Sequence, residues 1–216
     1  EVKENKIPYE EAKEQLHILL IDAVKIRLQS DVPYGSFLSG GIDSALVSSI
    51  ANTLQKEQLK TFTIGFEDKV FDESHVAGQF AEIINSEHHL IPSSQDELAV
   101  LMDNFFKAYD EPFADSSALP SLLLNKKVKE HVTVALSGDG GDESFLGYNH
   151  FAWVRKVSLL FLVPLFFRRL AAYVFPLKLI GKRGHSIKNI LLMNNLDEFI
   201  ESIFTGFDTL LLKDKK

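Results

Sequence analysis

The feature that most constrains the fold is a glycine-rich motif that occurs twice, each time between a short apolar run and a helical pattern. The first copy reads FLSGGIDSAL (residues 37–46) and the second LSGDGGDESFLGY (residues 136–148). In an open parallel sheet, ligands bind outside the carboxyl ends of the strands, where the strand order reverses. We therefore expect the two loops to follow strands and to face one crevice.

The rest of the chain alternates between strand and helix patterns. A β-branched and aromatic run at residues 59–66 predicts a strand, and EHHLIP (87–92) and VTVAL (132–136) are read as two more. Asp72 is expected to cap the helix after the first of them. Residues 95–109 are expected to form one helix whose inward side chains are Leu98, Leu101, Met102, Phe105 and Phe106. This alternation predicts an α/β fold, a doubly wound parallel sheet with flanking helices.

The pattern changes near residue 150, after which only helical signals follow. We expect two domains, residues 1–150 with the sheet and a helical subdomain at 151–216. The apolar run at 157–167 is interrupted by Pro164 and is shorter than the roughly twenty residues that a spanning helix needs. It predicts a buried or interfacial helix pair and no membrane span.

Composition excludes several classes of function. The formal net charge is −7, which argues against a general nucleic-acid binder, because such proteins present a basic face. The chain has no cysteine, which excludes disulfides, thiolate zinc sites and thiol nucleophiles. Its first residues are polar and acidic and contain no secretory signal, so we expect a cytoplasmic protein.

The first loop has the composition of a phosphate site. Glycines let successive N–H groups converge on an anion, and the N-terminus of the following helix adds its dipole. A carboxylate there fits a bridging Mg²⁺, with Asp142 as the matching ligand from the second loop. No lysine follows the glycines, so the loop is neither a Walker A motif nor a G-x-G-x-x-G fingerprint. The candidate residues are Ser39, Gly40, Gly41, Asp43 and Ser44.

These motifs resemble a known family. SGGIDS is similar to the pyrophosphate loop of the N-type ATP pyrophosphatases, and the wider set resembles the synthetase half of glutamine-hydrolysing asparagine synthetase. The wider set is DVPYGSFLSGGIDSALV, TFTIGF, the Glu-His-His strand, DEPFADSSALP and LSGDGGDESFLGY, in that order. The resemblance is strong over residues 8–150.

The resemblance implies roles for single residues. Leu38 and Ile64 fall at ATP-contacting positions beside the adenosine, and Ser137 and Gly138 at a second nucleotide contact. Asp139 falls where the family places an acidic residue tied to aspartyl-adenylate formation, often a glutamate. The implied magnesium ligands are Asp43 and Asp142, and the implied catalytic residues are Asp139, Asp142 and Glu143.

The implied substrates are ATP with Mg²⁺, aspartate, and ammonia from a glutaminase domain. We expect this chain to lack that domain, and to lack the lysine that acts on the departing pyrophosphate. Lys182, Arg183 and Lys188 are candidates for that lysine by charge alone, and a solvated face explains them better. A homodimer is compatible with the resemblance.

Several alternatives stay open. The same loop serves enzymes that activate other carboxylates, such as β-lactam synthetase and amidating enzymes of surface-polysaccharide pathways, and a non-catalytic nucleotide-binding module is a third option. The acidic residues of the second loop could simply cap the following helix. The segment DEPFADSS contains three acidic residues, Asp110, Glu111 and Asp115. About half of these acidic positions are explained by the preference of turns for such residues, and the rest could line the substrate side.

Overall fold

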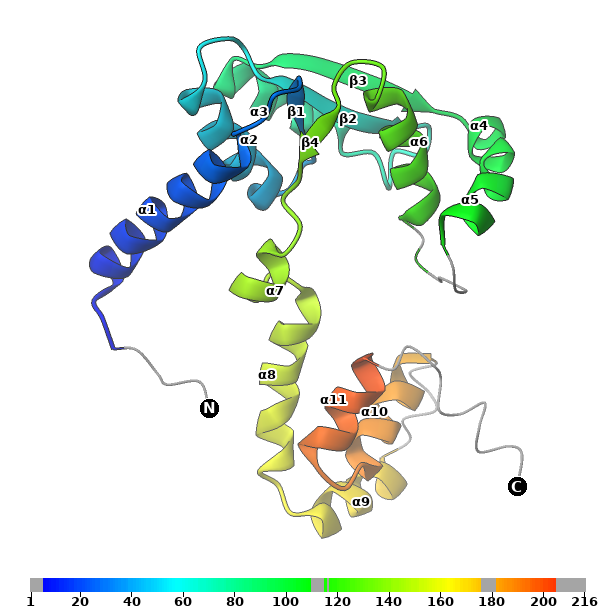
Figure 1. Cartoon of the computed structure of the whole chain (residues 1–216). Coiled ribbons are helices and arrows are strands. Elements are labelled where there is room, and N and C mark those ends of the chain that lie inside the picture. Colours follow the sequence, from blue (N-terminus) through cyan, green and yellow to red (C-terminus); the bar gives the residue numbers. More distant parts are fainter. Residues whose placement is uncertain (1–5, 110–114, 116, 176–181, 205–216) are drawn as a thin grey trace. The chain divides into compact units, whose positions relative to one another are not determined.

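The computed structural model describes residues 6–109, 115, 117–175 and 182–204 (Figure 1). The chain divides into two compact units, residues 1–141 and residues 142–216. The sequence pattern predicts this boundary slightly later, at residue 150. The elements are α1 (Tyr9–Arg27), β1 (Tyr34–Phe37), α2 (Ile42–Leu54), β2 (Lys60–Phe66), α3 (Ser74–Ile84), β3 (Glu87–Ser93), α4 (Gln95–Val100), α5 (Met102–Ala108), α6 (Ala118–Val128), β4 (Val134–Leu136), α7 (Gly141–Phe145), α8 (Asn149–Phe161), α9 (Leu165–Val174), α10 (Lys182–Leu192) and α11 (Leu196–Phe204).

The first unit is built on a parallel sheet with the strand order β3-β2-β1-β4. From β1 the chain adds β2 and then β3 on one side, and it returns to place β4 on the other side of β1. The strand order therefore reverses between β1 and β4, which is where open α/β sheets bind ligands. The predicted α/β fold is confirmed.

Helices cover both faces of this sheet (Figure 1). Side chains of a strand point alternately to opposite faces. On one face the buried Ser36 hydroxyl lies 2.8 Å from that of Ser48 in α2. On the other face Phe62 packs with Ile91 and with Val128 of α6. Each face of the sheet thus packs against helices through its own set of buried residues. The loops extend from the carboxyl ends of the strands.

Two local predictions were wrong in detail. The helix expected over residues 95–109 is broken into α4 and α5 at Leu101, which is buried and donates its N–H to the Leu98 carbonyl at 3.1 Å. That bond spans three residues instead of four, so the chain tightens there. In α5, Phe106 and Met102 are exposed instead of inward, at 70% and 41%.

The expected cap of α3 is displaced by one residue. The N-cap position belongs to Glu73, while Asp72 accepts N–H groups from Ser74 and from Phe66, both at 3.2 Å. Asp72 thereby joins the end of β2 to the start of α3. Its pKa is lowered from the ordinary value, first by the Ser74 hydroxyl and then by the Phe66 N–H.

The second unit is helical in its described residues, as predicted. Its buried residues include Val157, Ala172, Leu191 and Phe199, which come from α8, α9, α10 and α11 in turn. Among the described helices, none is by itself long and apolar enough to cross a membrane. Residues 141–161 and 165–174 reach that length and composition only together, and they are bent by 102°.

Candidate nucleotide-binding site

The first loop, which connects β1 to α2, is organised by two serines. The Ser44 hydroxyl oxygen accepts the Ser39 N–H at 3.1 Å, lies 2.8 Å from the Ser39 hydroxyl, and donates to the Gly41 carbonyl at 3.1 Å. The Gly41 N–H in turn donates to the Ser39 hydroxyl at 3.1 Å. Ser44 is buried, so these hydrogen bonds hold the loop backbone from its buried side.

One N–H group of this loop already binds an anionic oxygen. The Gly40 N–H donates to a carboxylate oxygen of Glu73 at 3.1 Å, although 33 residues separate the two in sequence. A carboxylate at this place shows that the loop can offer a backbone donor to an anion. Glu73 was not predicted from the sequence as a site residue, because nothing in the pattern places the start of α3 beside the glycines.

The second loop, which connects β4 to α7, touches the first within the same unit. A Cβ on Gly138 would fall 2.6 Å from the Ser44 nitrogen, and one on Gly141 would fall 2.6 Å from a carboxylate oxygen of Asp43. Real Cβ atoms do not approach other atoms so closely. Gly138 therefore needs glycine, because its Cβ would meet backbone atoms, whereas a side chain at Gly141 would displace the Asp43 carboxylate. Gly140, with φ of +90°, also has a backbone conformation that favours glycine. The two predicted loops therefore meet at the point where the strand order reverses.

The acidic residues of the second loop are distributed over both units. Asp139, in the first unit, accepts the Ser137 hydroxyl at 3.0 Å. In the second unit, the Asp142 carboxylate lies against Gly147, and Glu143 accepts the Tyr148 hydroxyl at 2.5 Å, which lowers its pKa. Asp142 and Glu143 occupy the first turn of α7, so the alternative role as helix-end charges stays open.

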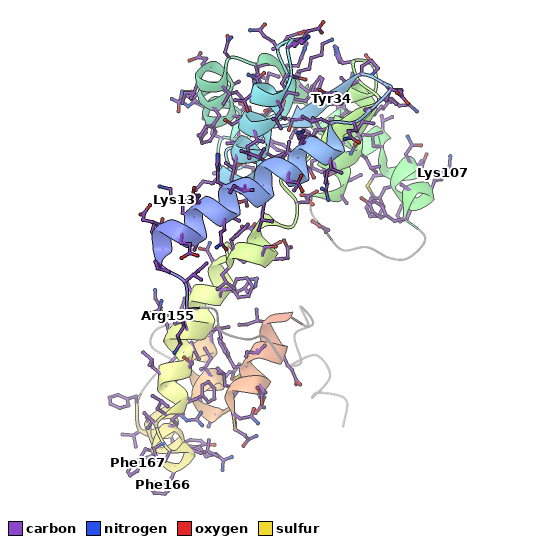
Figure 2. The ribbon with its side chains drawn as sticks, turned by 60° about the vertical axis from the view of Figure 1, so that its left-hand side comes forward. Lys13, Tyr34, Lys107, Arg155, Phe166 and Phe167 are labelled. Atoms are coloured by element: carbon purple, nitrogen blue, oxygen red, sulfur yellow. The ribbon has the colours of Figure 1, made fainter. Side chains whose placement is uncertain are left out.

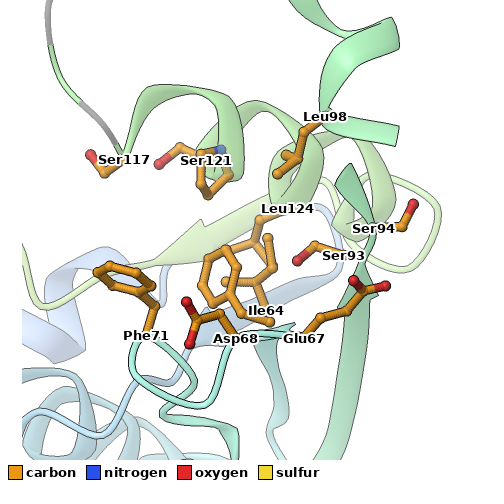
Figure 3. A pocket seen from close by; sticks show the side chains of 12 residues that line it. Ile64, Glu67, Asp68, Phe71, Ser93, Ser94, Leu98, Ser117, Ser121 and Leu124 are labelled. Carbon is orange, nitrogen blue, oxygen red and sulfur yellow. The ribbon is translucent and has the colours of Figure 1, made fainter. Parts of the chain in front are cut away.

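A cavity of about 560 Å³ opens at the carboxyl ends of β2 and β3 (Figure 3). Its wall includes Ile64 together with Phe71, Leu98 and Leu124, so a large part of it is apolar, and Ser93 and Ser121 add hydroxyl groups. Its volume lies in the range of small-molecule sites, which runs from roughly 300 to 1,000 Å³.

The two residues predicted beside the adenosine differ in placement. Ile64 lines this cavity, whereas the Leu38 side chain is 1% exposed and packs in a core cluster with Ala45, Ala77 and Ala81. The Leu38 N–H donates to the Phe62 carbonyl at 2.9 Å and its carbonyl accepts the Thr63 hydroxyl. The nucleotide contact of Leu38 stays a prediction.

Asp115 has a local structural role. Its carboxylate accepts the N–H and the hydroxyl of Ser117 at 2.8 and 2.7 Å, which lowers its pKa and orders the start of α6. Asp110 and Glu111, and the side chains of Lys182 and Arg183, lie outside the described residues. The Lys188 ammonium lies 5.2 Å from the centre of the Tyr173 ring.

Comparison with known proteins identifies the family. The model of the family described as asparagine synthase matches residues 15–196. The chain belongs to the asparagine synthase family.

Relatives with curated names support this membership. Asparagine synthetase [glutamine-hydrolyzing] 1 of Bacillus subtilis is 37% identical over 168 residues, which are 78% of this chain and 26% of that protein. A putative asparagine synthetase [glutamine-hydrolyzing] 2 of Methanocaldococcus jannaschii is 44% identical over 131 residues, 60% of this chain and 25% of that protein. The chain thus spans about a quarter of the length of these relatives.

Other matches have different names. Amidase chyE of Penicillium rubens is 33% identical over 147 residues, 61% of this chain and 22% of that protein. Among solved structures, an NH3-dependent NAD synthetase of Campylobacter jejuni overlaps with a TM-score of 0.41 and 20% identity, covering 66% of this chain and 62% of the other. The family assignment rests on the sequence matches.

The residues of this asparagine synthase family chain fit a magnesium nucleotide. The first loop presents N–H groups and hydroxyls, one of which already holds a carboxylate oxygen, as an anion site requires. Asp43 is half-buried beside Gly141, and a carboxylate is a ligand that Mg²⁺ prefers. Among the described residues no group of three or more potential ligands gathers, so any such ion would depend on few protein ligands and on phosphate oxygens.

Proposed function

We propose that the chain is an ATP-dependent synthetase domain that adenylates the side-chain carboxylate of aspartate for amidation by ammonia to asparagine. The observation that carries the proposal is the contact of the two predicted loops, at Gly138 with Ser44 and at Gly141 with Asp43. Family membership supports the same chemistry.

The proposal assigns a part of the nucleotide to each group of residues. Ser39, Gly40, Gly41 and Ser44 hold the two phosphates that leave as pyrophosphate, and the cavity beside Ile64 receives the adenosine. Asp43 of the first loop would hold Mg²⁺, which when bound would neutralise phosphate charge. Ser137 and Gly138 contact the nucleotide from the second loop.

The proposed reaction needs no protein nucleophile. An oxygen of the aspartate carboxylate forms a bond to the α-phosphorus while the bond from that phosphorus to the β-phosphate bridge oxygen breaks, so pyrophosphate leaves. Ammonia then adds to the activated carbonyl carbon, loses a proton, and expels AMP. Catalysis on this account is positioning of the substrates together with stabilisation of phosphate charge. We place Asp139 and Glu143 on the side of the carboxylate substrate.

The source of ammonia and the cellular location are also proposals. The names of the relatives describe glutamine hydrolysis, so we propose a glutaminase domain as the ammonia donor and the cytoplasm as the location.

The test is isotope exchange between pyrophosphate and ATP, with aspartate and Mg²⁺ present. We expect exchange that requires aspartate, because the adenylation step is reversible, and we expect Ser44→Ala to slow it. If the chain binds Mg-ATP but shows no exchange, the proposed adenylation is contradicted, and the chain is a non-catalytic nucleotide-binding module.

A second candidate changes only the acceptor. Relatives named as amidases favour it, since they match the same part of this chain. The same exchange assay, run with a panel of carboxylic acids in place of aspartate, distinguishes the two: the true acceptor is the acid that supports exchange at the lowest concentration.

A further inference from the structure

The second unit contains a segment with charge of one sign only. Between Ser144 and Leu196 the sequence has eight lysines and arginines and no aspartate or glutamate. The whole chain has 30 acidic and 23 basic residues, so this segment opposes the balance of the rest. Such asymmetry points to an anionic partner for the segment.

Helix α9 turns its most apolar face outward. Its buried positions are Arg168 and Ala172. The opposite stripe, at helical spacing, is apolar and exposed, with Phe166 at 71% and Tyr173 at 73%. Figure 2 shows the side chains of Phe166 and Phe167 extending away from the ribbon.

The exposed stripe continues into the turn that precedes α9. Leu162 in this turn is 79% exposed, and Leu159 at the end of α8 is 67% exposed. We name the set the outer patch: Leu159, Leu162, Phe166, Phe167, Leu170 and Tyr173. Contiguous apolar surface on a folded unit marks an interaction site.

The buried arginine fixes this orientation. The Arg168 guanidinium donates to the carbonyls of Val163 at 3.0 Å, Met193 at 2.8 Å and Asn194 at 3.3 Å. It also lies 4.5 Å from the centre of the Phe161 ring. A rotation of α9 that buried its apolar stripe would pull the Arg168 guanidinium away from these carbonyls. The carbonyls would then be left without their donor, which costs free energy.

Exposed cations accompany the outer patch. Arg155 and Lys156 lie on α8 and Arg169 on α9, all exposed. In the part of the chain that the structure describes, none of the ion pairs joins these three to a carboxylate. Arg169 donates to the side-chain oxygen of Asn194 at 3.4 Å and keeps its charge. Apolar side chains and exposed cations on neighbouring helices are the features that bind a helix into the interface of an anionic bilayer.

We propose that the outer patch docks on the surface of an anionic phospholipid bilayer. In the described part of the chain no single helix is long and apolar enough to cross a membrane, so the proposal is a surface contact and no span. Aromatic residues such as Trp153 on α8 and Tyr173 on α9 are enriched at that depth. A soluble protein with an acidic, apolar surface is the competing partner, and the test separates the two.

The test is co-sedimentation of the chain with phosphatidylcholine vesicles, with and without phosphatidylglycerol. We expect binding only to the anionic vesicles, weakened by salt because the attraction of surface charges is screened. Phe166→Ser and Tyr173→Ser should each weaken binding about tenfold, and Arg155→Gln about fivefold.

The matched control is Ile83→Ser, because Ile83 is 77% exposed on α3 of the other unit. We expect it to bind vesicles like the parent chain, and all variants to keep the parent melting temperature. Equal binding to neutral vesicles, binding to neither kind, or an equal loss in Ile83→Ser would overturn the proposal. So would a dimer that forms with rising protein concentration and is abolished by Phe166→Ser, since a second copy would then cover the patch.

Discussion

The carboxylate of Asp43 lies directly against the Cα of Gly141, although the two residues come from different strand-end loops. The space that a Cβ would need at Gly141 is occupied by both carboxylate oxygens, at 2.6 and 2.8 Å. The loop after β4 therefore determines where the carboxylate from the loop after β1 can point. Gly141 thus leaves the room that the carboxylate of Asp43, our proposed metal ligand, occupies.

Gly141→Ala should impair nucleotide binding much more than folding. The new methyl group displaces the Asp43 carboxylate, which is the end of a short side chain that can rotate away. We expect the free energy of unfolding to change by less than about 1 kcal/mol, while the affinity for Mg-ATP, measured by calorimetry, falls about tenfold.

Gly78→Ala is the control for that substitution. Gly78 lies in α3 with open space where a Cβ would be. Alanine there should stabilise the helix by about 1 kcal/mol and leave Mg-ATP affinity unchanged. If the two variants bind Mg-ATP equally well, the proposed positioning of Asp43 by Gly141 is wrong.

Glu73→Gln should strengthen the binding of pyrophosphate. The amide oxygen of glutamine can accept the same Gly40 N–H bond, but the negative charge next to the phosphate loop is removed. Two like charges about 4 Å apart in water repel by about 1 kcal/mol, so we expect about a fivefold gain in affinity by calorimetry.

Glu82→Gln makes the same charge change further along the helix, where Glu82 is exposed. It should leave pyrophosphate affinity unchanged. A weaker affinity in Glu73→Gln would mean that the carboxylate assists the anion, contrary to this account.

Asp72 should make a contribution to stability that depends on pH. Its pKa in the folded chain lies below the ordinary 3.8, so the contribution is present above 3.8 and is lost as the pH falls through the lower folded value. At neutral pH, Asp72→Asn should melt at a lower temperature than the parent chain, because the charged acceptor of the Ser74 and Phe66 groups is lost. Well below pH 3.8 the two melting temperatures should converge; a constant difference at all pH values would contradict the assignment.

The sequence predicted the parallel sheet and the meeting of the loops because both follow from local pattern and topology. The run at β2 is rich in β-branched and aromatic residues, and glycines follow the ends of β1 and β4. The contact of Gly40 with Glu73 could not be predicted, since it depends on how α3 packs beside the loop. The break at Leu101 was missed for a similar reason: its burial within the first unit overrides the helical periodicity of residues 95–109.

The helical unit was predicted only in outline. Periodicity indicates helices from residue 149 onward, but it does not tell which stripe of α9 is buried. The apolar run at 157–167 predicts a buried or interfacial helix pair, yet Phe166 is exposed and Arg168 is buried, because carbonyl groups after the end of α10 accept hydrogen bonds from the guanidinium. Charged residues are rarely fully buried, and this one is satisfied by neutral acceptors.

The most direct test of the account is the affinity of Asp43→Asn for ATP, measured by calorimetry with Mg²⁺ and again with the metal chelated. If Asp43 is a metal ligand, the substitution should weaken Mg-ATP binding about tenfold or more, leave the metal-free affinity unchanged, and keep the melting temperature of the parent chain. An unchanged affinity for Mg-ATP, or an equal loss with and without the metal, would contradict the account.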